Sequence, residues 1–139
     1  IKSIRKSDST ASWTYNSTTQ RYQNNNTANR IDVVCGESQG IQATLQCDVA
    51  TASAATPAIF IYYQQTIPAS STSVGAQISF GRRGLNANML SVIHNICIGY
   101  SGLFPSGFNT IGAVENVNVV ATVTFYSGNA QGLTGTWAC

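Results

Sequence analysis

Charged residues are scarce in this chain. Lys, Arg, Asp and Glu together make up 9% of the 139 residues, against a usual share of about 25%. The net charge of +2 is too small to steer the protein strongly toward nucleic acid or anionic lipid. An apolar content of 43% excludes intrinsic disorder, which needs low hydrophobicity and high net charge. We therefore expect a folded protein with a neutral, hydroxyl- and amide-rich surface and no nucleic-acid partner.

The chain is also poor in the groups that catalysis uses. It has a single histidine, His94, and five carboxylates that stand apart in the sequence: Asp8, Asp32, Glu37, Asp48 and Glu115. Asp32 and Asp48 fall on expected strands, where a fold could pair them as in a glycosidase. No G-x-S-x-G motif and no glycine-rich phosphate loop occurs. We expect no enzymatic activity, no cofactor and no metal ion.

No segment has the 18 or so consecutive apolar residues of a membrane-spanning helix. The chain begins with Ile1 and not with Met, and its first basic residues are not followed by the apolar region of a signal peptide. These features favour the processed form of a secreted precursor. We expect a secreted or cell-surface protein without a transmembrane segment.

The four cysteines fit an oxidising environment. Cys35, Cys47, Cys97 and Cys139 lack the close spacing of a zinc knuckle, so two disulfides are predicted. Of the three possible pairings, we favour Cys35–Cys47, which would join two neighbouring strands, and Cys97–Cys139, which would fasten the last residue to a central strand. Four reduced thiols are the alternative.

Strand patterning, in contrast, is abundant. In residues 117–126, β-branched and aromatic residues alternate with period two, which is typical of a strand with one buried face. Eight to ten short strands separated by Gly, Asn and Ser predict an all-β fold, an antiparallel two-layer sandwich of the Ig-like or jelly-roll type. We expect one domain over residues 1–139, in which the basic residues 1–12 form a flexible or partner-bound arm.

The other expected strands cover residues 11–15, 21–23, 31–35, 41–49, 57–63, 76–81, 95–100 and 134–139. Residues 57–63 are apolar almost throughout, which predicts burial on both faces. Leu85, Met89 and Ile93 have the i, i+4 spacing of a helical turn.

Residues 99–108 are the first candidate binding site. They carry Tyr100, Leu103, Phe104 and Phe108. The interspersed glycines and Pro105 argue against a regular strand here. These side chains either close one end of the core or, if exposed, contact a partner, a sugar ring or a lipid surface.

Two smaller features are further candidates. Arg82 and Arg83 are flanked by glycines and could hold a carboxylate or sulfate by forked hydrogen bonds, or simply protect a strand edge. Tyr62 and Tyr63, followed by two glutamines, could form a carbohydrate platform, or one of them could belong to the core.

In size, strand patterning and amide-rich surface, the chain resembles the subunits and adhesin domains of bacterial surface fibres. No motif carries the resemblance, so no residue role follows from it. Residues 1–12 depart from the pilus pattern, because they are basic and polar where a pilus subunit has an apolar segment for strand donation.

The leading prediction is a binding protein that is not an enzyme: an adhesin, a lectin-like domain or a fimbrial subunit. Its partner would be a carbohydrate or protein receptor on a surface, or copies of itself in a fibre. One alternative is a small, disulfide-stabilised secreted toxin or effector. The other is a self-assembling structural subunit of a filament or capsid.

Overall fold

A computed structural model describes residues 2–118, 121–127 and 132–137. These residues form strands and two single 3-10 turns, and no helix among them is long and apolar enough to cross a membrane. The elements in chain order are β1 (Lys2–Lys6), β2 (Ser12–Tyr15), β3 (Arg21–Tyr22), η1 (Gln23–Asn25), β4 (Arg30–Cys35), β5 (Gln39–Thr51), β6 (Pro57–Gln64), β7 (Ala76–Arg82), η2 (Ala87–Met89), β8 (His94–Phe104), β9 (Gly107–Val117), β10 (Val123–Tyr126) and β11 (Gly132–Trp137).

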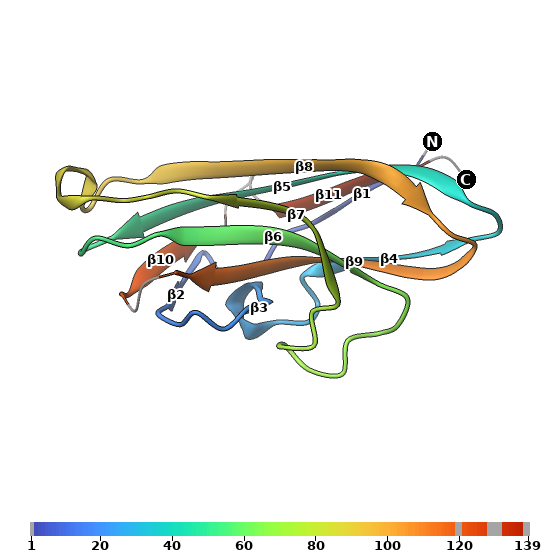
Figure 1. The fold of residues 1–139 in the computed structure, drawn as a ribbon, viewed down its shortest axis with the longest axis horizontal. Coiled ribbons are helices and arrows are strands. Elements are labelled where there is room, and N and C mark those ends of the chain that lie inside the picture. The colour runs from blue at the N-terminus through green and yellow to red at the C-terminus, as the bar shows by residue number, and fades with distance from the viewer. Residues whose placement is uncertain (1, 119–120, 128–131, 138–139) are drawn as a thin grey trace.

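Two antiparallel sheets lie face to face (Figure 1). In sheet A, the long strand β5 pairs with β8 along one edge and with β10 and β11, one after the other, along its other edge. These two strands pair in turn with β2 and β1. In sheet B, β9 pairs with β6 on one side and with β3 and β4 on the other, and β7 lies beyond β6. The predicted antiparallel two-layer sandwich is confirmed.

The main core lies between the sheets. Alternate residues of β4 and β5 are buried, as period-two patterning requires. The rings of Trp13 and Phe125 stack in this core with centroids 6.1 Å apart. Leu45, Ile59 and Ile111 have no exposed area or almost none, and burial of each such side chain contributes about 1.5–3 kcal/mol.

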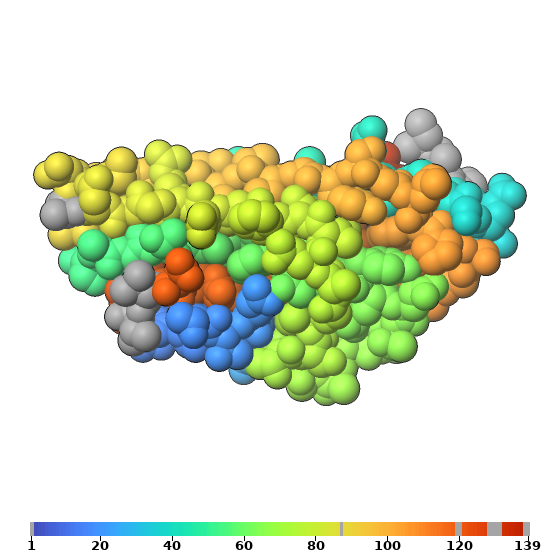
Figure 2. Space-filling model, viewed as in Figure 1, coloured from blue at the N-terminus to red at the C-terminus, as the bar shows by residue number. Residues whose placement is uncertain are grey.

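A second apolar cluster covers part of the outer face of sheet B. It consists of Tyr22, Ala58, Phe60, Tyr62 and Val114, with Val74 packed against them. The loop of residues 65–75 lies over it and accepts a 2.7 Å hydrogen bond at the Ser71 carbonyl from the Tyr22 amide. In Figure 2 this loop is the green and lime bulge at the lower margin. Strand β6 is therefore buried on both faces, as predicted.

Residues 2–6 form β1, although no side-chain pattern predicted a strand there. All five side chains are exposed, and the strand is held by backbone pairing with β11. Such a strand leaves no hydrophobic signature in the sequence, because its register is set by the partner strand.

The prediction of one continuous strand over residues 117–126 is wrong. Strand β9 ends at Val117 in sheet B, and β10 begins at Val123 in sheet A. Val117, Val123 and Phe125 all face the same core, but from opposite sheets. The period-two alternation of apolar residues indicates which side chains face inward, but it does not indicate to which sheet they belong. Residues 119 and 120 lie outside the described residues.

The argument against a regular strand in residues 99–108 is also wrong. Strand β8 continues to Phe104 and β9 begins at Gly107, so only a short turn separates them. A side chain at Gly102 would collide with the Tyr100 ring. Gly102 thus makes room for the Tyr100 ring on the same face of β8. The glycines that argue against a strand in the sequence lie within strands.

The predicted Cys35–Cys47 disulfide is not formed. Cys35 ends β4 in sheet B, whereas Cys47 lies eight residues into β5 of sheet A. At about 3.3 Å per residue, that length of strand carries Cys47 far from the turn that joins the two strands. For the Cys97–Cys139 pair, Cys97 is exposed on β8, and Cys139 lies outside the described residues.

In the folded, mildly reduced protein, iodoacetamide should alkylate Cys97 and leave Cys47 unmodified. Burial, followed by the nearby Glu115 carboxylate, raises the pKa of the Cys47 thiol to about 12, so the reactive thiolate is scarce. Peptide mass spectrometry with and without denaturant measures both sites. The Cys97→Ser variant should lose the alkylation that occurs without denaturant. Alkylation of Cys47 without denaturant would contradict the described packing.

Candidate functional site

Glu115 on β9 points into the interior of the sandwich. The alternation of β9 places it on the same face as Ile111, Ala113 and Val117, which belong to the main core. Its side chain has no exposed area. A carboxylate at such a position needs hydrogen-bond donors in place of water.

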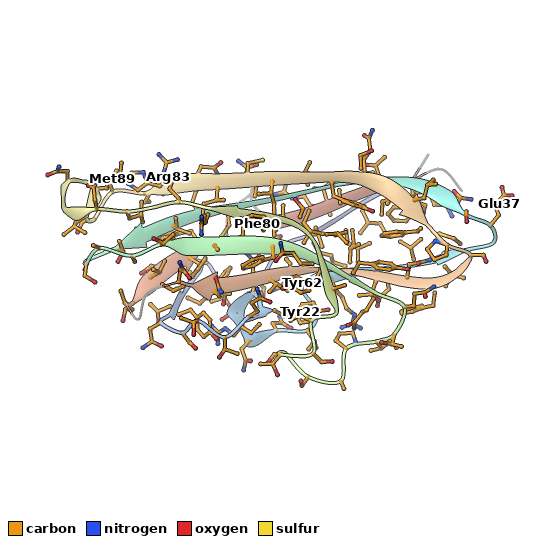
Figure 3. The ribbon with its side chains drawn as sticks, in the orientation of Figure 1. Tyr22, Glu37, Tyr62, Phe80, Arg83 and Met89 are labelled. Carbon is orange, nitrogen blue, oxygen red and sulfur yellow. The ribbon has the colours of Figure 1, made fainter. Side chains whose placement is uncertain are left out.

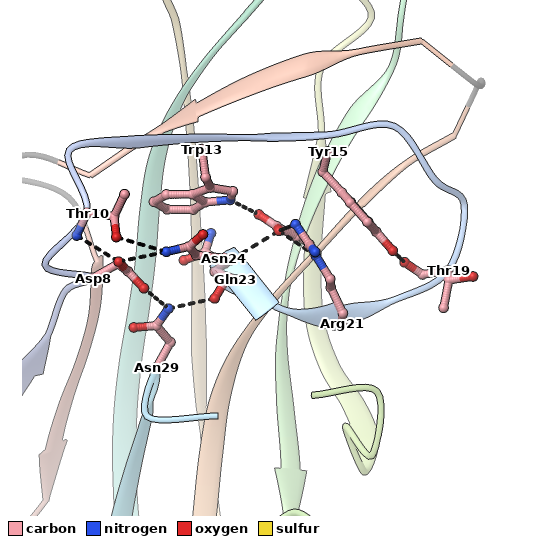
Figure 4. A network of polar contacts seen from close by, with 10 residues as sticks. Asp8, Thr10, Trp13, Tyr15, Thr19, Arg21, Gln23, Asn24 and Asn29 are labelled. Atoms are coloured by element: carbon pink, nitrogen blue, oxygen red, sulfur yellow. Dashed lines mark hydrogen bonds and ion pairs between the residues drawn. The ribbon is translucent and has the colours of Figure 1, made fainter. Parts of the chain in front are cut away.

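Three donors from the N-terminal part of the chain satisfy Glu115 (Figure 4). The Trp13 indole donates from Nε1 to Oε2 over 2.7 Å. Arg21 donates from Nε to Oε1 over 3.0 Å, and its Nη2 forms an ion pair with the same oxygen at 2.9 Å. The backbone amide of Asn24 donates to the same oxygen over 3.2 Å. The Tyr15 ring lies 3.7 Å from the Arg21 guanidinium carbon, which fixes the arginine from its other side.

A second carboxylate, Asp8, organises the surface next to this site (Figure 4). Its Oδ1 accepts from the Thr10 amide at 2.8 Å and from Asn24 Nδ2 at 3.0 Å. Its Oδ2 accepts from Asn29 Nδ2 at 2.8 Å and from Asn26 Nδ2 at 3.3 Å. Burial alone would raise the pKa of Asp8, but these hydrogen bonds together lower it below its usual value. Asp8 thus holds residues 8–10 against residues 24–29, and Glu115 joins residues 13–24 to β9.

Burial raises the pKa of Glu115 to about 7, although the hydrogen bonds from Trp13 and Arg21 and the charge of Arg21 act in the opposite direction. A carboxyl with this pKa would suit acid–base chemistry, but a dissolved substrate cannot reach a side chain with no exposed area. The arrangement therefore joins the two sheets. This arrangement was not predicted from the sequence. A signal was present, because Glu115 stands at the period-two spacing of the core residues Ile111, Ala113 and Val117.

Among the residues that the structure describes, the other titratable groups are not gathered into a reactive centre. His94 lies with Nε2 3.3 Å from the Met89 carbonyl. Asp32 accepts hydrogen bonds on the outer face of sheet B, and Asp48 accepts one from Asn95 on sheet A, so the suggested carboxylate pair is not brought together. Within the described ranges, no three His, Cys, Asp or Glu residues converge as metal ligands.

The four apolar residues of 99–108 do not form one exposed patch. Phe104 is buried, with its ring centroid 4.9 Å from that of Tyr63. Tyr100 packs against the main core and Phe108 is half-buried. Leu103 is 72% exposed on the outer face of sheet A. The residues largely close one end of the core, which is the first of the two interpretations of this segment.

Tyr62 and Tyr63 point to opposite faces of β6, so they do not form a joint platform. Tyr62 is buried in the outer cluster, and its hydroxyl donates to Gln20 Oε1. The Tyr63 hydroxyl donates over 2.8 Å to Asn109 Oδ1. In Figure 3, Tyr62 and Tyr22 lie together below β6, where the loop of residues 65–75 passes.

Arg82 and Arg83 are both exposed but serve different faces. The Arg83 guanidinium donates over 3.2 Å to the Asn95 carbonyl on β8. Arg82 lies on the outer face of sheet B and forms no ion pair with any residue in the described part of the chain.

The open part of the outer face of sheet B contains a shallow cleft, which we call the Phe80 cleft. Figure 2 shows this face hollowed between β7 above and the blue residues of β2 and β3 below. The cleft has a volume of about 190 Å³ and is lined by Ala58, Phe60, Gln77, Phe80, Arg82, Asn116 and Asn118.

Phe80 is the aromatic wall of this cleft (Figure 3). It is 57% exposed, and its ring stacks on buried Phe60 at a centroid distance of 6.4 Å. The sequence did not single out Phe80, because an aromatic residue within a strand normally belongs to a core. Only the position of the covering loop over the neighbouring part of the sheet leaves it exposed.

The polar side chains of the cleft remain available to a ligand. Asn116 donates from Nδ2 to the Thr18 carbonyl over 3.1 Å, which leaves its Oδ1 as an acceptor. Gln77 and Asn118 are exposed. No acidic residue is among the lining residues. An aromatic face beside amides and a guanidinium group suits a ligand with one apolar face and polar edges.

No protein-family model and no curated protein matches the sequence. Among solved structures, the chain is similar to a CocE/NonD family hydrolase from Staphylococcus aureus, with 11% identity and a TM-score of 0.44 over 91% of this chain and 32% of the hydrolase. It is also similar to the structure of infectious bursal disease virus, Gx strain, with 12% identity and a TM-score of 0.30 over 98% of this chain and 39% of the viral chain. The chain thus spans about a third of the solved proteins that it matches.

The free energy of unfolding should fall as the pH rises from about 4.5 to about 7. The raised pKa of Glu115 in the folded state means that the folded protein holds this proton more tightly than the unfolded chain does. The contribution of this proton to the stability of the fold is complete below the pKa that Glu115 has in the unfolded chain. It is lost, by on the order of 3 kcal/mol, as the pH rises through the pKa that Glu115 has in the folded protein. Urea denaturation across this range measures it. In the Glu115→Gln variant, the free energy of unfolding should vary much less with pH over this range. An unchanged pH dependence in that variant would show that another group causes it.

Proposed function

We propose that this protein is a lectin-like binding protein that is not an enzyme and recognises a sugar ring in the Phe80 cleft. The observation that carries the proposal is the exposed Phe80 ring, braced from behind by Phe60 and bordered by amide side chains. A sugar ring has one face of C–H groups and a rim of hydroxyls. The ring of Phe80 complements the first, and Gln77, Asn116 and Asn118 complement the second.

The dimensions of the cleft support a small ligand unit. Its volume of about 190 Å³ is below the roughly 300–1,000 Å³ of pockets that enclose drug-sized molecules. One ring of a longer saccharide would be held, with its neighbours in solvent. Recognition of this kind needs contact with the sugar ring and hydrogen bonds to its hydroxyls, and it needs no general acid or base.

We also infer that the sandwich is a jelly roll forming one domain. Three pairs of short strands each occupy one position in the topology: β1 with β2, β3 with β4, and β10 with β11. The sandwich then has eight positions. In chain order, the first pairs with the eighth, the second with the seventh, the third with the sixth and the fourth with the fifth. A rolled-up long hairpin has this order, whereas the first two strands of an Ig-like sandwich pair with each other. Jelly rolls occur in lectin and capsid domains. A neutral, amide-rich surface favours a secreted or cell-surface location.

Phe80→Ala should weaken saccharide binding about tenfold or more, equivalent to about 1.4 kcal/mol, because it removes the aromatic wall of the cleft. A glycan array followed by calorimetry on the best ligand measures this effect. Leu103→Ala is the matched control, since Leu103 is also an exposed apolar residue but lies on the opposite sheet. Wild-type protein that binds nothing on a broad array would overturn the proposed function.

A second candidate function, self-assembly into a filament, is favoured by the placement of other exposed apolar residues. Val34 and Leu103 are each 72% exposed. Val34 stands next to the last residue of β4 and Leu103 pairs with Gly40 near the start of β5, so both are close to the β4–β5 turn, whose Glu37 marks one end of the molecule in Figure 3. Val92 and Ile93 are 53% and 57% exposed. They stand between η2 and β8, a few residues after Met89, which lies at the opposite end of the molecule in Figure 3. Apolar groups at two opposite ends suit a head-to-tail contact, which generates an open filament when it does not close into a ring.

If the protein assembles in this way, concentrated wild-type protein should elute as polymers in size-exclusion chromatography and form filaments in electron micrographs. Leu103→Asp should convert it to a monomer, because a buried unpaired charge in the contact is costly. Ile67→Asp, at a 64% exposed site in the loop of residues 65–75, should leave assembly unchanged. A wild-type monomer at every concentration would remove this candidate.

A further inference from the structure

We propose that the Phe80 cleft selects acidic saccharides, whose carboxylate is held by the Arg82 guanidinium. This inference rests on the proposed carbohydrate-binding function and names its ligand class. It follows from the placement of Arg82 in the sheet, from the charge of the cleft, and from the different surroundings of Arg83.

The sheet register places Arg82 and Asn116 on either side of a small floor residue. Ala58 of β6 is paired with Arg82 of β7 on one side and with Asn116 of β9 on the other. Neighbouring strands lie about 4.8 Å apart, so the backbones of Arg82 and Asn116 are about 10 Å apart across Ala58. This spacing leaves room for one sugar ring between a cationic side chain and an amide.

Arg82 also shares a face with the aromatic wall. Phe80 and Arg82 are separated along β7 by Gly81, where an added Cβ would collide with Ile98 on β8. Gly81 therefore faces the interior, and its two neighbours face outward, about 7 Å apart along the strand. A ring stacked on Phe80 would place an exocyclic carboxylate within reach of the guanidinium.

The charge of the cleft favours an anion. Arg82 has no ion-pair partner among the residues that the structure describes, and the lining contains neither Asp nor Glu. A guanidinium presents two parallel N–H donors that match the two oxygens of a carboxylate. A neutral ligand would leave these donors to water, whereas a uronic or sialic acid would use them.

Arg83 provides a matched control within the same chain. It has the same side chain and is also exposed, but its guanidinium donates to the Asn95 carbonyl on β8 and is absent from the cleft lining. A general attraction of anions by surface charge would respond equally to the loss of either arginine. A site centred on the cleft responds only to the loss of Arg82.

The test is a glycan array in which every uronic and sialic acid glycan stands beside its methyl ester, and every sulfated glycan beside its desulfated form. Wild-type protein should bind carboxylates at least tenfold more tightly than their esters, and this preference should decrease at high salt. Arg82→Gln should weaken binding of the acids and reduce the ratio to about one, and Arg82→Lys should give an intermediate ratio. Arg83→Gln should leave the ratio unchanged, and equal melting temperatures would show that all variants fold.

The possible failures are distinguishable. If wild-type protein binds esters as tightly as acids, the selectivity for acidic saccharides is wrong and carbohydrate binding stands. If Arg82→Gln keeps the preference, or Arg83→Gln abolishes it, the assignment to Arg82 is overturned. Preference for sulfated over carboxylate glycans would overturn the choice of anion. Silence of the whole array overturns the proposed function itself.

Discussion

The structure depends on one buried carboxylate and its donors. Glu115 lies between two apolar sheets, and its oxygens are satisfied by an indole, a guanidinium and a backbone amide that all come from residues 13–24. Removing a partner from such a buried pair typically costs about 3–5 kcal/mol. The carboxylate thus determines the path of the N-terminal residues across the sandwich. Its sheet neighbour Arg21 also places the adjacent Tyr22 on the outer face, where the second cluster forms.

That second cluster determines where the surface is covered and where it is open. Tyr22 anchors the loop of residues 65–75 through Ser71, and the loop covers the part of the outer face around Tyr62. Phe60 belongs to both regions: it meets Tyr62 edge-on with centroids 5.9 Å apart and stacks on Phe80. The Phe80 cleft is consequently the uncovered continuation of a packed surface, and Ala58 and Phe60 in its lining are buried.

The covering of the sheets by other segments also decides which aromatic residues are buried and which are exposed. The sequence predicted possible contact roles for three aromatic residues that stand in runs or near glycines: Tyr62, Tyr63 and Phe104. In the structure, each of them takes part in internal packing. Phe80 stands in an ordinary strand and is exposed. Local context therefore did not show which aromatic side chains are exposed, since exposure depends on which segment crosses above a given strand.

The sequence by itself determined that the chain forms short antiparallel strands in two layers, that residues 57–63 are buried on both faces, and that residues 31–35 and 41–49 form strands. Period-two alternation carries this information because side chains on a strand point alternately to its two faces. Only the tertiary structure decided that residues 117 and 123 belong to different sheets, that Cys35 and Cys47 lie apart, that Glu115 is internal, and that Phe80 and Arg82 share an open cleft. Each of these depends on contacts between segments distant in the chain, and alternation within one strand contains no information about its partner strands.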